Sequence, residues 1–123
     1  MLKLVDTCGW LEYYSNGPRA EIYAGHLQDL AQVITPTIIV YELYKKIKAE
    51  RGEEAALLAI AQLNKTRVIA LNQEIALSAA EVSLRYKLPM ADAVIYATAI
   101  SEGAEVVTGD VHFRDLPGVV WVG

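Results

Sequence analysis

The segment Leu2–Asp6, with the sequence LKLVD, decides the fold because it predicts a short buried strand that ends in a carboxylate. The pattern returns near the end of the chain, where Val106–Thr108 predicts a strand that leads to Gly109 and Asp110. Two further acids, Glu42 and Asp92, interrupt apolar stretches. Carboxylates are seldom buried unless they are paired or bound to a metal. These four acids are therefore the first candidates for a functional site.

The composition narrows the class of protein. The 123 residues fit one compact domain that spans residues 1–123. The net charge of -4 argues against a general nucleic-acid coat, but not against an enzyme that meets nucleic acid through a metal. The 54% of hydrophobic residues exceeds what so small a core can bury, so we expect a partner or a second copy.

The location of the protein is predicted from what the sequence lacks. Its one cysteine, Cys8, excludes an internal disulfide and a cysteine-based zinc site. No apolar run approaches the roughly 20 residues of a membrane span, and the N-terminus has no signal-peptide pattern. We therefore expect a cytoplasmic protein that does not enter a membrane.

Strands alternate with helices along the whole chain, which predicts an α/β fold with a mostly parallel five-stranded sheet flanked by helices. The expected strands are Leu2–Val5, Gln32–Thr35, Val68–Leu71, Val106–Thr108 and Val119–Val122. The expected helices are Thr7–Tyr14, Arg19–Leu30, a helix from about Pro36 and Thr37 that ends before Gly52, Glu53–Leu63, a helix capped by Asn72 that runs to about Tyr86, and Met90–Glu102.

This topology predicts where the four acids meet. In a parallel α/β sheet every helix begins near the edge at which the strands end. Asp6 and Asp110 each follow a predicted strand, Asp92 lies in the first turn of a helix, and Glu42 lies within two turns of a helix start. All four therefore belong to the edge where open α/β folds place their ligand crevice.

Four carboxylates at one place favour a divalent metal. Without a cation they repel one another, whereas Mg²⁺ or Mn²⁺ prefers oxygen ligands and would neutralise them. Such a site can activate water for attack on a phosphodiester. The chain has no phosphate-binding glycine loop and no nucleophile elbow, and its histidines, His26 and His112, lack metal-ligand spacing.

Ordinary structural roles compete with this interpretation for each acid taken alone. Asp6 is a good helix cap, Asp92 suits the first turn of a helix, and Glu42 can pair with Lys45 and Lys46 along an exposed stripe. At the level of the whole chain, a phospho-acceptor receiver domain or a metal-binding module without turnover shares the acidic pocket. A receiver domain, however, needs adjacent acids after the first strand, and here Asp6 stands alone.

The order of the motifs resembles PIN-domain nucleases, and in particular the VapC toxins of VapBC toxin–antitoxin pairs. The resemblance spans nearly the whole chain. It rests on Leu4–Cys8 with Trp10 and Leu11, on Ile34–Thr37 with Tyr41–Leu43, on Pro89–Ala93 with Ile95–Ala99, and on Val107–Asp110 with His112, Phe113 and Leu116–Val119.

This resemblance implies a single PIN domain with a three-layer sandwich fold and a Mg²⁺- or Mn²⁺-dependent endoribonuclease activity. It places the catalytic and metal-binding roles on Asp6, Glu42, Asp92 and Asp110, with Thr108 and Thr7 in support. It also implies an RNA substrate, a VapB-type antitoxin and a homodimer. A PIN nuclease of RNA processing or quality control is the alternative within the same family.

Several other positions have weaker expectations. Relatives often have serine where this chain has Cys8, and a thiol is a weaker hydrogen-bond partner. Asp115 is an additional acid that is equally consistent with a loop residue. The candidates for RNA-backbone contact are Lys45, Lys46, Lys48, Arg85, Lys87 and Arg114.

Overall fold

The computed structural model describes residues 1–123 and contains one five-stranded sheet in the order β3-β2-β1-β4-β5. Every neighbouring pair of strands is parallel, so the sheet is fully rather than mostly parallel, and the α/β prediction is confirmed. The strands are β1 (Lys3–Val5), β2 (Val33–Pro36), β3 (Arg67–Ile69), β4 (Glu105–Thr108) and β5 (Val119–Trp121).

Six α-helices and two short 3-10 helices connect the strands. They are α1 (Thr7–Ser15), α2 (Ala20–His26), η1 (Leu30–Gln32), α3 (Thr37–Arg51), α4 (Glu53–Leu63), α5 (Gln73–Tyr86), α6 (Met90–Glu102) and η2 (Val111–Phe113). Both α4 and α6 have the predicted bounds. The side chain of Asn72 caps α5 by accepting a hydrogen bond from the Ile75 amide, as expected.

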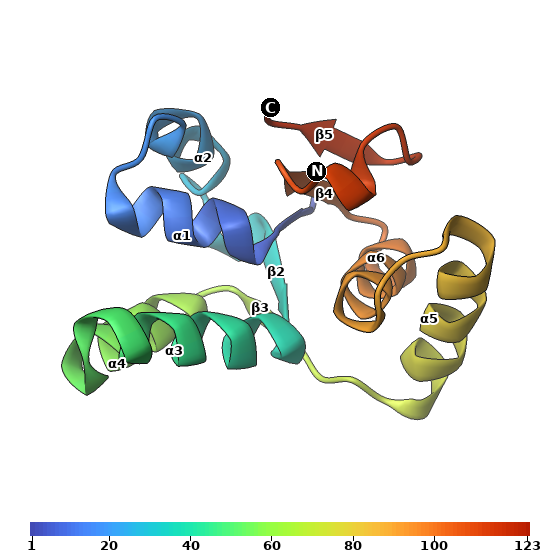
Figure 1. Ribbon diagram of the computed structural model, residues 1–123, viewed down its shortest axis with the longest axis horizontal. Helices are drawn as coiled ribbons and strands as arrows, with labels where there is room; N and C mark the ends of the chain where they lie inside the picture. The colour runs from blue at the N-terminus through green and yellow to red at the C-terminus, as the bar shows by residue number, and fades with distance from the viewer.

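The helices form the two outer layers of a three-layer sandwich. Figure 1 shows α1 to α4 on one side of the sheet and α5 and α6 on the other. The chain moves outward from β1 through β2 to β3, then returns by way of α5 and α6 to β4, on the other side of β1. The order of the strands therefore reverses between β1 and β4, which is where doubly wound sheets open a crevice.

The core holds the strands of this crevice in place. The fully buried Leu4 and Val5 of β1 lie beside the buried Val106 and Val107 of β4. Gly9 of α1 lies so close to Tyr23 that an added Cβ would approach a ring carbon to 2.5 Å. The first turn of α1 is thus packed tightly against the strands and α2.

One predicted helix is wrong in length. The expected helix Arg19–Leu30 ends at His26, and the 3-10 helix η1 follows after Asp29, whose side chain accepts a hydrogen bond from the Ala31 amide. This local side-chain bond gives the backbone an alternative to continuing the α-helix.

The helix α3 begins at Thr37, within the predicted range. Thr37 does not cap the helix; Pro36 occupies the cap position, and the Thr37 hydroxyl accepts a hydrogen bond from the Leu71 amide. None of the six α-helices combines the length and the apolar character that crossing a bilayer would require.

Candidate active site

The structure brings the four predicted acids to one edge of the sheet. Asp6 follows β1 and caps α1, and Asp110 follows β4 and caps η2. Because β1 and β4 are adjacent, these two acids lie next to each other at the point where the strand order reverses. Asp92 comes from the first turn of α6, and Glu42 comes from the second turn of α3.

Asp6 is the most deeply buried of the four acids, with 4% of its surface exposed. Its Oδ1 accepts a hydrogen bond from the Thr7 amide at 2.8 Å, and its Oδ2 accepts one from the Thr108 hydroxyl at 2.9 Å. Burial raises the pKa of Asp6 from 3.8 to about 6. The hydrogen bonds from Thr108 and Thr7 oppose this increase, whereas the charges of Asp110 and Glu42 add to it.

Asp92 shows the mutual repulsion of the cluster. Burial raises its pKa from 3.8 to about 7, and the neighbouring charges of Asp110, Asp6 and Glu42 contribute in the same direction. His112 opposes the increase, because its Nδ1 lies 3.2 Å from Asp92 Oδ2. The other three acids therefore all influence the ionisation of this one carboxyl, which places the four in a common electrostatic field.

The side chain of Thr108 connects the ends of β1 and β4 through hydrogen bonds. Its hydroxyl donates to Asp6 Oδ2 and accepts a hydrogen bond from the Asp110 amide at 2.9 Å. The residue is fully buried, so both bonds are shielded from water. One hydroxyl group thus fixes the position of one acid and the backbone of another.

Thr7 connects the opposite wall of the site to the same acids. Its hydroxyl donates to Glu42 Oε1 at 2.7 Å, which ties the first turn of α1 to α3. The competing interpretation of Glu42, as a partner of Lys45 and Lys46, does not match the structure. Lys46 instead pairs with Glu50 at 3.2 Å, and Lys45 lies over the ring of Tyr41.

Cys8 lies at the margin of the acidic cluster rather than in the hydrophobic core. Its Sγ is 3.5 Å from Thr108 Oγ1 and 3.8 Å from Asp6 Oδ2. Burial, together with the charge of Asp6, raises the pKa of the thiol above its usual value. Cys8 is therefore a neutral, weakly polar neighbour of the acids.

The structure corrects the expectation for His112 and favours the loop interpretation of Asp115. His112, which has no metal-ligand spacing in the sequence, forms with Asp92 and Asp110 a group whose ligand atoms all lie within 4.8 Å of one another. The sequence feature that could have predicted this is the position of His112 two residues after Asp110, on the same turn. Asp115 is absent from that group and occupies an exposed turn position with a φ of 70°.

The donor set suits a hard divalent cation. Four carboxylates converge from four separate elements, and burial together with the charges of the neighbouring acids raises the pKa values of Asp6 and Asp92. Mg²⁺ and Mn²⁺ are bound in proteins mainly by carboxylate and other oxygen ligands. The residues present could therefore hold such an ion.

The sequence matches the model of the PIN domain over residues 3–119. The chain belongs to the PIN domain family. The comparison with curated proteins gives no match. With the family established, the receiver-domain alternative is no longer needed to explain the alternating strands and helices.

Solved structures with the same PIN fold include several toxin–antitoxin proteins. A chain of a toxin–antitoxin complex from Klebsiella pneumoniae is 27% identical, with a TM-score of 0.82 and coverage of 96% of this chain and 95% of that one. A VapBC complex from Rickettsia felis, bound to a DNA fragment from its promoter, is 18% identical, with a TM-score of 0.78 and coverage of 99% and 98%. A Mycobacterium tuberculosis VapC toxin described as cleaving the sarcin-ricin loop is 20% identical, with a TM-score of 0.70 and coverage of 87% and 90%. The expected resemblance to VapC-type PIN domains is confirmed.

Proposed function

We propose that this PIN domain is a Mg²⁺- or Mn²⁺-dependent endoribonuclease and the toxin of a type II toxin–antitoxin pair. The observation that carries the proposal is the convergence of Asp6, Glu42, Asp92 and Asp110 at the switch point between β1 and β4. The family match and the toxin–antitoxin structure at 27% identity support the same conclusion.

The four carboxylates are the proposed ligands of the ion. A bound divalent ion would supply a reactive water and charge stabilisation for the phosphodiester under attack. Thr108 orients Asp6 through its hydroxyl, and Thr7 orients Glu42 in the same way. These bonds hold the acids in place before a cation arrives, so little reorganisation is needed on binding.

A hollow beside Glu42 supports a polyanionic substrate. It has a volume of about 310 Å³ and is lined by Tyr41, Glu42, Lys45, Lys46 and Ala49. Lysines attract phosphate groups, and an exposed tyrosine offers a face on which a base can stack. Tyr41 is 59% exposed, so its ring is accessible. We infer that an RNA strand enters along α3 to reach the acids.

Three of the other basic candidates have local aromatic neighbours, as Lys45 has in Tyr41. Lys48 lies over Tyr44, Arg85 over Tyr86 and Arg114 over Trp121. The proposal favours Lys45 and Lys46 over the remaining candidates, because only these two line the hollow next to an acid of the site.

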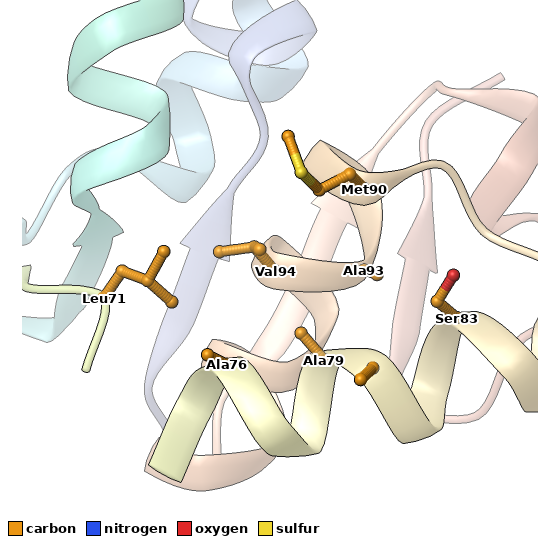
Figure 2. A pocket seen from close by; sticks show the side chains of 8 residues that line it. Leu71, Ala76, Ala79, Ser83, Met90, Ala93 and Val94 are labelled. Carbon is orange, nitrogen blue, oxygen red and sulfur yellow. The ribbon is translucent and has the colours of Figure 1, made fainter. Parts of the chain in front are cut away.

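The proposal includes a VapB-type antitoxin and a homodimer, and exposed apolar surface supports such partners. Leu84 and Met90 are 80% and 78% exposed. Between α5 and α6 lies a hollow of about 340 Å³ that is almost entirely apolar. Figure 2 shows side chains of α5 and α6 on its walls, with Leu71 across from Val94. Apolar surface of this kind is typical of interaction sites.

Substitution of two acids tests the proposed activity. Asp6→Asn and Asp92→Asn should each abolish Mn²⁺-dependent cleavage of labelled RNA while the protein remains folded by circular dichroism. Asp29→Asn is the matched control, because Asp29 precedes β2 and so lies at the opposite edge of the sheet. Full activity of either site variant in the presence of EDTA would refute the mechanism.

A further inference from the structure

His112 occupies a position that the protein fixes from two sides. It lies in the middle of η2, whose last residue, Phe113, is fully buried in the core. The first turn of η2 is capped by Asp110, whose Oδ1 accepts a hydrogen bond from the His112 amide at 3.0 Å. The imidazole is therefore held near the acids by the backbone as well as by its own contacts.

The ring nitrogen of His112 faces two carboxylates from different elements. Nδ1 is 2.8 Å from Asp110 Oδ1 and 3.2 Å from Asp92 Oδ2. The ligands of an octahedral ion with bonds of about 2.1 Å lie about 3 Å apart along each edge. The two measured separations bracket that value. Each of the three residues thus presents one atom at a spacing that a single ion can bridge.

Resting on the proposed function, we propose that His112 is a nitrogen ligand of the metal ion held by Asp92 and Asp110, and that it makes the site prefer Mn²⁺ to Mg²⁺. Imidazole nitrogen is a poorer ligand for Mg²⁺ than for first-row transition ions, whereas carboxylates serve both. An all-carboxylate set would give little discrimination between these ions, and one imidazole in the set supplies it.

A purely structural role for His112 predicts different chemistry. In that case the imidazole only balances the charge of the two acids and stays outside the coordination sphere. The side chain is 51% exposed, compared with 15% for Asp92 and 27% for Asp110, so solvent already screens much of such an ion pair. The two roles differ in whether a metal–nitrogen bond forms, and that bond can be observed directly.

Pulsed electron paramagnetic resonance of bound Mn²⁺ detects this bond. The spectrum of the wild type should contain ¹⁴N modulation from a coordinated imidazole. His112→Phe, which keeps a ring but removes the ligand atom, should lose it. His26→Phe is the matched control, because the chain has only two histidines and His26 instead contacts Lys3 Nζ at 2.9 Å. That control leaves His112 as the only histidine and should keep the signal.

Calorimetric titration with each ion supplies the second measurement. In His112→Phe, the ratio of Mn²⁺ to Mg²⁺ affinity should fall about tenfold, which is within the usual range for loss of a group that supports a metal site. If His112→Phe does not fold, ¹⁵N-histidine labelling of His26→Phe still decides the question, because the modulation should change from the ¹⁴N to the ¹⁵N pattern.

The outcomes separate this inference from the proposed function. If the wild type binds Mn²⁺ and cleaves RNA without nitrogen modulation, His112 is not a ligand and the nuclease proposal stands. An unchanged affinity ratio in a folded His112→Phe variant also overturns the inference. If the wild type binds neither ion at millimolar concentration, the proposed function fails, and this inference fails with it.

Discussion

Replacement of Asp6 by Asn should stabilise the metal-free protein at alkaline pH even though it destroys the site. Asp6 is 4% exposed and has a pKa of about 6 instead of 3.8. Its folded-state pKa is thus raised, so any favourable contribution is present below pH 4 and is lost as the pH rises through 6. Above that pH the folded protein holds a buried charge that the unfolded chain would expose to water.

The magnitude follows from the size of that increase. A difference of about 2 pKa units corresponds to about 3 kcal/mol at 1.36 kcal/mol per unit. Asn is neutral and has nearly the same shape, but its amide group faces the Thr108 hydroxyl where Asp6 Oδ2 accepts a bond. Rearranging that one hydrogen bond costs about 1 kcal/mol. The expected net stabilisation of Asp6→Asn at pH 8 is therefore about 2 kcal/mol.

Urea unfolding at pH 4, 6 and 8 in the presence of EDTA measures this difference. The variant should be slightly less stable than the wild type at pH 4, where the folded-state carboxyl of Asp6 is protonated and the unfolded-state carboxyl, with a pKa near 3.8, is about half ionised; it should be more stable than the wild type at pH 8. Saturating Mn²⁺ should raise the free energy of unfolding of the wild type but not of the variant. A stability difference between the two proteins that does not change sign between pH 4 and pH 8 would show that burial of the Asp6 charge is not what strains the site.

Two further substitutions test the packing and the hydrogen bonds around the acids. Thr108→Val should destabilise the protein by about 1–3 kcal/mol, because a buried carboxylate oxygen and an amide lose their partner. Thr108→Val should also move the acidic limb of the pH–rate profile to higher pH, because it removes a hydrogen bond that lowers the pKa of Asp6. Thr98→Val is the control, because the Thr98 hydroxyl bonds only within α6, and it should leave the acidic limb unchanged. Gly9→Ala should cost about 1–3 kcal/mol in thermal or urea unfolding through overpacking. Gly25→Ala, in which the added Cβ would meet no other atom within 4 Å, should change stability by less than about 1 kcal/mol and serves as the control.

The positions of the acids could be predicted from the sequence because they depend only on the order and direction of the strands and helices. Asp6 and Asp110 follow strands, and in a parallel sheet all strand ends share an edge, so their meeting did not depend on side-chain detail. The bounds of α4 and α6 were also predictable, because Gly52 and Gly103 flank them with positive φ values of 92° and 68°.

The parts that were missed depend on short local structure or on packing between helices. The early end of α2 reflects one side-chain bond from Asp29 that competes with helical hydrogen bonding. The approach of His112 to Asp92 requires η2 to be anchored by a buried phenylalanine and α6 to pack nearby, and neither is visible as residue spacing. The bond from Thr7 to Glu42 likewise depends on how α1 lies against α3.

The hydrogen bonds around the acids explain how a repulsive cluster remains in one place without a cation. Burial, together with the charges of the neighbouring acids, raises the pKa values of Asp6 and Asp92, so holding both carboxylates ionised costs free energy in the folded protein. The Thr108 hydroxyl opposes separation of the two strand ends, because it bonds Asp6 and the backbone of Asp110 at once. A cation that binds here removes the repulsion between the carboxylates, and its ligands are already held in place by hydrogen bonds. If this argument is correct, metal binding should weaken more in Thr108→Val than the loss of one hydrogen bond would imply, because the ligands would then have to be ordered at the moment of binding.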